Sequence, residues 1–155
     1  MWPKVEAWDH WVRTLAEIAK RQPQPAYSGL VMSIQLEWQY LQRTVPGVGN
    51  MMGTIEDTLI EALFPELFGG EEVSADLREV LGYSVKRGGL GISDSRMLVE
   101  HVYNNSKADS EVRVGSLLGV NNLNYVVHKN CVPRSSTDAR KQQEYLEKQV
   151  LTRRK

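Results

Sequence analysis

Residues 3–19 read PKVEAWDHWVRTLAEIA, and apolar side chains recur through them at spacings of three and four residues. The series is Val5, Trp8, Val12, Leu15 and then Ile18 or Ala19. This period is typical of an α-helix with one buried face. Pro3 suits the first helical turn, and Pro23 and Pro25 end the pattern. The stretch therefore predicts one amphipathic helix of about five turns.

A second helical pattern starts near Pro25 and stops at the turn-forming residues 45–50, VPGVGN. Its apolar face is formed by Tyr27, Leu30 or Val31, Ile34, Trp38 and Leu41. The short connection around Pro23 favours an antiparallel pair with the first helix. These two helices hold all four tryptophans, and we expect each of them to be a core residue rather than a base-stacking one: Trp2, Trp8, Trp11 and Trp38.

A third helix is predicted from Thr54, a suitable N-cap residue. Glu56 and Asp57 would then lie in its first turn, where carboxylates favour the positive helix end. Its apolar face would be Ile55, Leu59, Ala62 and Leu63. Pro65 and the glycines at 69–70 are expected to end it.

Ser74 is expected to cap a short helix that Gly82 ends in the left-handed conformation. Residues 83–92 have no helical period and contain three glycines in four positions, so they predict a structured loop or a short hairpin. Ser93 or Asp94 is then expected to cap a long helix that ends at Gly119.

The segment 121–132 is ambiguous between helix and strand, because short apolar runs fit both. Residues 136–155 predict a basic helical arm with few apolar residues. The expected fold is therefore all-α, with helical hairpins in a small bundle. We expect a domain over 1–132, in which the glycine-rich loop 82–93 joins two hairpin halves, and an extended arm over 133–155. The expected core is Trp8, Leu15, Leu30, Ile34, Trp38, Leu59, Leu63, Val102 and Leu118.

Charge is unevenly distributed along the chain. Residues 1–133 carry 12 basic and 16 acidic side chains, a net charge of −4, whereas residues 134–155 carry 7 basic and 3 acidic, a net charge of +4. A basic tail of this kind favours an anionic partner, although solvated helices also show such a bias. Cys131 is the only cysteine, so a disulfide within the chain is excluded and a reducing compartment is expected. We expect an intracellular protein, in the cytoplasm or nucleus, with neither a signal peptide nor a membrane span.

The residues offer no catalytic, metal or small-molecule site. The three histidines are far apart in sequence and lack zinc-site spacing, and no Asp-Asp pair is present to hold two magnesium ions. Gly88-Gly89-Leu90-Gly91 does not match a phosphate-binding loop, because neither Gly-x-x-x-x-Gly-Lys nor Gly-x-Gly-x-x-Gly is present. Cys131 has only His128 near it, with no third orienting group. We expect no catalytic residue, no metal ligand and no cofactor.

Two strings give the chain a resemblance to a known family. Residues 26–38, AYSGLVMSIQLEW, followed by Arg43 and the Pro-Gly-Val-Gly of 46–49, resemble a stretch downstream of the polymerase domain in certain eukaryotic retrotransposon reverse transcriptases. Residues 85–94, VKRGGLGISD, are similar to an element that recurs after the polymerase core in retrotransposons lacking long terminal repeats. With residues 106–112 and 139–141, the similarity covers most of residues 4–148.

The resemblance implies a thumb-like, non-catalytic role in an RNA-directed DNA polymerase. The family's catalytic aspartates would lie upstream of Met1, and the upstream polymerase domain would be a partner. A second implied partner is RNA or an RNA–DNA hybrid, bound weakly and without sequence preference. The implied backbone contacts are Lys86, Arg87, Arg134, Arg140, Lys141, Arg153, Arg154 and Lys155. The alternative function is a helical protein-interaction module that docks a partner helix on its tryptophan faces or its C-terminal arm.

Overall fold

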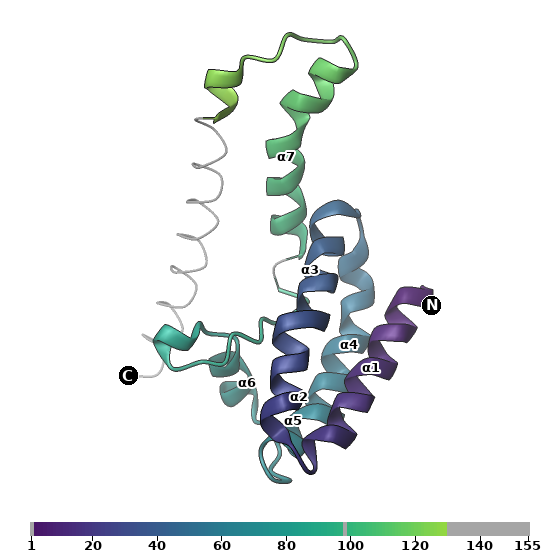
Figure 1. The fold of residues 1–155 in the computed structure, drawn as a ribbon, viewed down its shortest axis with the longest axis vertical. Helices are drawn as coiled ribbons and strands as arrows, with labels where there is room; N and C mark the ends of the chain where they lie inside the picture. Colours follow the sequence, from purple (N-terminus) through teal and green to yellow (C-terminus); the bar gives the residue numbers. More distant parts are fainter. Residues whose placement is uncertain (1, 98, 130–155) are drawn as a thin grey trace. The chain divides into compact units, whose positions relative to one another are not determined.

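The computed structural model describes residues 2–97 and 99–129 (Figure 1). Every regular element in these ranges is helical, so the all-α prediction is confirmed. The chain forms two compact units, residues 1–99 and residues 100–155. The predicted arm over 133–155 lies outside the described residues, and its boundary with a 1–132 domain stays a prediction.

Unit 1 begins with the predicted amphipathic helix, α1 Pro3–Ala19. Its proline occupies the first turn, where the missing N–H costs no hydrogen bond. The apolar period places on one side the buried residues Val5, Trp8, Val12, Ala16 and Ala19. Leu15 is only half-buried and Ile18 is exposed, because the buried face follows Ala16 and Ala19 instead.

The second helix runs from Pro23 to Thr44 in three pieces: α2 Pro23–Gly29, a π-helical turn η1 Leu30–Ile34, and α3 Gln35–Thr44. It lies antiparallel to α1 (Figure 1). The Trp8 and Trp38 rings meet edge to face with centroids 6.3 Å apart. Further along the pair, a Cβ on Gly29 would lie 3.2 Å from Leu15, so the missing side chain allows this close approach.

A third helical segment follows the turn after α3. It consists of the 3-10 turn η2 Val48–Met51, α4 Met52–Thr58, the π-helical turn η3 Leu59–Leu63 and α5 Phe64–Leu67. The predicted N-cap at Thr54 is wrong, because the helix starts at Met52 and Thr54 is inside it. The predicted end at Pro65 and the glycines 69–70 is confirmed for the glycines, since α5 ends at Leu67 just before them, but is wrong for Pro65, which lies within the helix. The π turn ends directly before α5, so Pro65 falls in a first turn, where a proline is tolerated.

The core of unit 1 lies among these three helical segments. Trp8, Leu30, Trp38, Leu59 and Leu63 are fully buried, and Ile34 is nearly so, as predicted. Trp2 and Trp11 are partly exposed, so the prediction that all four tryptophans are core residues is wrong for these two. Trp11 lies on the solvent side of α1, where the Lys4 ammonium sits 5.8 Å from its ring centre.

The short helix α6 Ala75–Leu81 begins as predicted, with the Ser74 hydroxyl accepting the Leu77 N–H at 3.2 Å. Its end differs from the prediction, because Gly82 has right-handed dihedral angles of −72° and −19°. The left-handed position falls later, at Gly88, with a φ of 82°. Gly88 directly follows the 3-10 turn η4 Val85–Arg87.

Unit 2 contains most of α7, which spans Val99–Leu117. The predicted cap at Ser93 or Asp94 is wrong. Asp94 instead accepts the Arg96 N–H at 2.8 Å, which closes a local turn before the helix begins. The two asparagines at 104–105 do not interrupt α7.

The segment 121–129, which could have been helix or strand from its sequence, contains a short helix. Residues 125–129 are helical, and Asn124 caps them by accepting the Val127 N–H on its side-chain oxygen at 3.1 Å. The predicted core positions in this unit are wrong: Val102 is half-buried and Leu118 is 73% exposed. The reason is that apolar residues of α7 are spread around the helix and form no single stripe.

Candidate nucleic-acid interface

The two strings that carry the family resemblance lie against each other in unit 1. The Tyr27 hydroxyl donates to the Leu90 carbonyl at 2.6 Å, and the Gln35 amide donates to the Gly91 carbonyl at 2.9 Å. Residues 26–38 and 85–94 are therefore joined by direct hydrogen bonds across more than fifty positions of sequence.

Two more glutamines on the same helix extend this contact. The Gln39 amide donates to the Ser93 hydroxyl at 3.2 Å, and the buried Gln42 amide donates to the Ser95 carbonyl at 2.9 Å. We call the four helical side chains the loop-binding face: Tyr27, Gln35, Gln39 and Gln42. It binds the extended segment 90–95, which has no secondary structure of its own to satisfy its carbonyl groups.

A buried ion pair holds the other side of the same loop. Glu56 is fully buried, and its carboxylate accepts hydrogen bonds from Nε and, at 3.0 Å, from Nη2 of Arg78. Nη1 of Arg78 donates to the Ile92 carbonyl at 2.8 Å, and the guanidinium lies 5.2 Å from the Phe64 ring centre. Such a pair is tolerated in a core because each charge has a geometrically matched partner.

This role of Glu56 corrects the prediction that it stabilises a helix end. The sequence does contain a signal for burial, because Glu56 shares the apolar face of its helix with Met52, Ile55, Leu59 and Leu63. A charged residue within an apolar stripe requires a buried partner of opposite charge. Gln35 and Gln42 carry a similar signal, since they lie seven residues apart beside the stripe of Ile34 and Trp38.

The glycines of the loop are required by close backbone packing. A Cβ on Gly89 would lie 2.1 Å from the Tyr83 carbonyl oxygen and 2.6 Å from that of Val80. Gly91 has a φ of 70°, and its N–H donates to the Tyr83 carbonyl at 2.8 Å. The predicted structured loop is confirmed, and it contains a 3-10 turn rather than strands in this described segment.

The turn Val85–Arg87 presents the predicted contact residues of the loop. Val85, Lys86 and Arg87 are all exposed. Their backbone is held by hydrogen bonds from the Arg87 and Gly89 N–H groups to the Ser84 carbonyl, at 2.8 and 3.2 Å. Two basic side chains are thus displayed on a fixed turn, an arrangement suited to contacts with phosphate oxygens.

The other predicted contact residues belong to the C-terminal part of the sequence. Arg134, Arg140, Lys141, Arg153, Arg154 and Lys155 all lie outside the described residues. Arg96, the next basic residue after the turn, is paired with Asp94 at 3.1 Å. Burial of Asp94 raises the pKa of its carboxyl, but hydrogen bonds from Arg96 outweigh this effect, and the pKa lies below its ordinary value.

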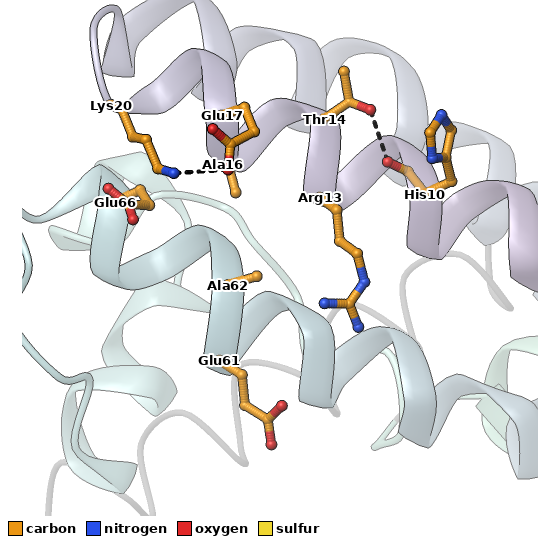
Figure 2. Close-up of a pocket in the computed structure, with 9 residues that line it drawn as sticks. All are labelled: His10, Arg13, Thr14, Ala16, Glu17, Lys20, Glu61, Ala62 and Glu66. Atoms are coloured by element: carbon orange, nitrogen blue, oxygen red, sulfur yellow. Dashed lines mark hydrogen bonds and ion pairs between the residues drawn. The ribbon is translucent and has the colours of Figure 1, made fainter.

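A shallow pocket of about 420 Å³ lies elsewhere in unit 1, between α1 and the η3–α5 segment (Figure 2). Its charged and titratable lining residues are His10, Arg13, Glu17, Lys20, Glu61 and Glu66. Lys20 donates to Glu17 at 2.7 Å, and the Thr14 hydroxyl donates to the His10 carbonyl at 2.9 Å. The lining has two basic and three acidic side chains, and its one hydroxyl group, that of Thr14, is engaged with backbone, so no lining residue stands out as an activated nucleophile.

Neither 2–97 nor 99–129 contains a cluster of three or more histidine, cysteine or acidic side chains placed to hold a metal ion. Across the same ranges, no helix combines the length and apolar character needed to cross a membrane. In comparisons with known proteins, no family model matches the chain, and neither a curated protein nor a solved structure matches it.

Proposed function

We propose that this chain is a non-catalytic helical segment of a reverse transcriptase of the retrotransposon type that lacks long terminal repeats. It lies downstream of the polymerase core and assists template and primer binding in an intracellular compartment. The turn Val85–Arg87 contacts the nucleic-acid backbone through Lys86 and Arg87. The basic residues beyond 133 add to this electrostatic contact.

One observation supports the proposal above the others. The two strings with family resemblance form one hydrogen-bonded element, through Tyr27 with Leu90 and Gln35 with Gly91. Because the two strings contact each other directly, both help to hold the loop that carries Lys86 and Arg87. The buried Glu56–Arg78 pair adds to this fixation by its bond to Ile92. A rigid display lowers the entropy lost on binding.

The test is fluorescence anisotropy of the full chain with a labelled RNA–DNA hybrid at about 50 and about 200 mM salt. We expect binding that weakens steeply with salt. The double substitution Lys86→Gln/Arg87→Gln should lower the magnitude of the salt slope by about 1 to 2, because up to two phosphate contacts are lost. The matched control is Lys20→Gln/Arg21→Gln, which removes an adjacent and exposed Lys-Arg pair from the end of α1.

Absence of binding at about 50 mM salt by a folded chain would overturn the proposal. So would equal losses in the two double variants, because binding would then depend on net charge alone. Truncation before Arg134 separates the contribution of the tail from that of the turn.

A second candidate function is a helical protein-interaction module. The observation in its favour is the exposed apolar face of the second helix, where Met32, Leu36 and Tyr40 are 74%, 55% and 64% exposed. Trp8 and Trp38 are fully buried, so among the tryptophans only Trp2 and Trp11 offer contact area. A truncation that abolishes self-association but leaves hybrid binding intact would favour this function.

A further inference from the structure

The solvent face of the second helix carries apolar side chains in one line. Met32, Leu36 and Tyr40 follow one another at four-residue spacing, and each has more than half of its side chain exposed. Residues four apart lie on the same side of a helix. We call these three residues the apolar stripe.

The surroundings of the apolar stripe are uncharged. Residues 22–36 contain no Asp, Glu, Lys or Arg. Glu37, the first charged residue after them, is 34% exposed and is paired, since its carboxylate accepts hydrogen bonds from Lys4 and, at 3.1 Å, from the Trp8 indole. The next charged side chain on the exposed surface of the helix is Arg43. Met32 and Leu36 thus lie within an uncharged stretch about four turns long, and Tyr40 lies one turn beyond it.

The neighbouring helix α1 has the opposite surface. Its exposed side carries charged residues toward both ends: Lys4, Glu6, Arg13 and Glu17. A helix with one buried face ordinarily has this polar outer side. Loss of charge together with enrichment in methionine and aromatic residues is the composition of an interface centre. The second helix therefore has two faces built for contact, one toward the core and one outward.

We infer that the apolar stripe binds the same stripe of a second copy of this chain, in an antiparallel crossing centred on Leu36. A face without charge selects a partner without charge, because a charge buried against it would lose its water with nothing in exchange. A second copy offers such a face by symmetry, and a two-fold axis makes the contact self-complementary. Exposed serines at positions 28 and 33 flank the stripe and permit close approach of the helices.

The antiparallel direction follows from the charge of Arg43, which lies beyond one end of the stripe. In a parallel pairing the two exposed Arg43 side chains would lie side by side and repel each other. In the antiparallel pairing each Arg43 faces the uncharged start of the other helix. Met32 then meets Tyr40 of the second copy, a favourable contact between sulfur and an aromatic ring.

Sedimentation velocity of the full chain over about 1 to 100 µM tests the association itself. We expect a concentration-dependent dimer. Leu36→Glu should raise the dissociation constant at least about 100-fold, because it places two carboxylates at the two-fold axis. Ile18→Glu on α1 is the matched control, since it adds the same charge at another exposed apolar site of unit 1 and should leave the constant unchanged. Circular dichroism verifies that each variant is folded.

Cysteine cross-linking tests the geometry without a destabilising charge. In a Cys131→Ser background, Leu36→Cys alone should form a disulfide-linked dimer, because residue 36 meets its own copy. Met32→Cys and Tyr40→Cys should each cross-link poorly alone but well when the two variants are mixed. A monomer at about 100 µM would overturn the inference, as would a dimer unaffected by Leu36→Glu or cross-links of Met32→Cys with itself.

Discussion

The two units of the chain are both helical, yet they differ in what their apolar residues do. Among the described residues of unit 1, eighteen buried apolar side chains form one cluster around Trp8, Trp38 and Phe64. Among the described residues 100–129, no apolar side chain is buried, although valines and leucines are frequent there. Leu117, Val120 and Tyr125 are each more than 60% exposed. Apolar content alone therefore does not make a core.

Spacing accounts for the difference. In α1 the apolar residues recur every three or four positions and meet on one face. In α7 the residues Val99, Val102, Val112, Val114 and Leu117 fall on several sides of the helix. A helix of the second kind gains its stability from local backbone bonds and exposed contacts rather than from a buried stripe.

Tryptophan fluorescence separates the two units in an experiment. All four tryptophans lie in unit 1, while unit 2 contains none. Urea unfolding followed by this signal therefore measures unit 1, and far-ultraviolet circular dichroism measures both. A comparison of the two signals tests whether the units unfold together.

The largest effect is expected for Trp8→Ala. It removes a fully buried ring that packs on Trp38, and such a change lowers the free energy of unfolding by about 3 to 5 kcal/mol. Leu118→Ala in unit 2 should change it by less than about 0.5 kcal/mol, because that side chain is 73% exposed. Urea midpoints from both signals give the two values. Equal losses in the two variants would contradict the contrast between the units.

Arg78→Met should lower the free energy of unfolding somewhat less, toward the lower end of about 3 to 5 kcal/mol. The reason is that it leaves the Glu56 carboxylate buried and unpaired. Adding Glu56→Leu to this variant should restore part of the stability. The comparison in unit 2 is Arg113→Met, which removes one hydrogen bond to the His128 ring, 2.5 Å long, and should cost about 1 kcal/mol. No recovery in the double variant would show that the guanidinium acts mainly through Ile92 and Phe64.

The smallest changes in stability are expected for two glycine substitutions, one in each unit, which should act in opposite directions. Gly89→Ala should destabilise unit 1 by about 1 to 3 kcal/mol, because the new methyl group would collide with the Tyr83 carbonyl. Gly115→Ala in α7 meets only the movable Asn121 side chain, and alanine favours the helix, so the change should be neutral or stabilising by up to about 1 kcal/mol. Thermal melts followed by both signals measure the two shifts. Destabilisation by Gly115→Ala would indicate a fixed contact with Asn121.

Sequence reasoning predicted the parts of the fold that depend on local pattern. The helix α1, the Ser74 cap and the structured glycine loop are seen as predicted. Other predictions were wrong where a contact with a residue far away in sequence determines the local structure. Glu56 looked like a helix-end charge, but it pairs with Arg78, 22 residues away. Gly82 looked like a left-handed stop, but its backbone is right-handed and the chain turns left-handed at Gly88.

The candidate interface was predicted only in part. The sequence singled out Lys86 and Arg87 because they adjoin a glycine cluster, and both are exposed on the turn. It did not single out the loop-binding face, because glutamines give no charge signal and their partners, two carbonyl groups and a hydroxyl, are more than fifty residues away. The binding roles of all the predicted basic residues stay predictions.

The π-helical turn η1 also changes the direction in which the side chains after it point around the axis of the second helix. In an ideal α-helix, Tyr27 and Gln35 are eight steps apart and would point about 80° away from each other. A π turn absorbs one extra residue, which leaves about seven effective steps and brings them to within about 20°. Gln35 and Gln42, seven steps apart in α3, are already aligned. Conversion of 30–34 to regular α-helix without a deletion would rotate Tyr27 away from Gln35, whereas deletion of one residue there would remove the π turn and keep the two aligned at seven steps. A single inserted residue thus fits the joint reach of three side chains onto one loop.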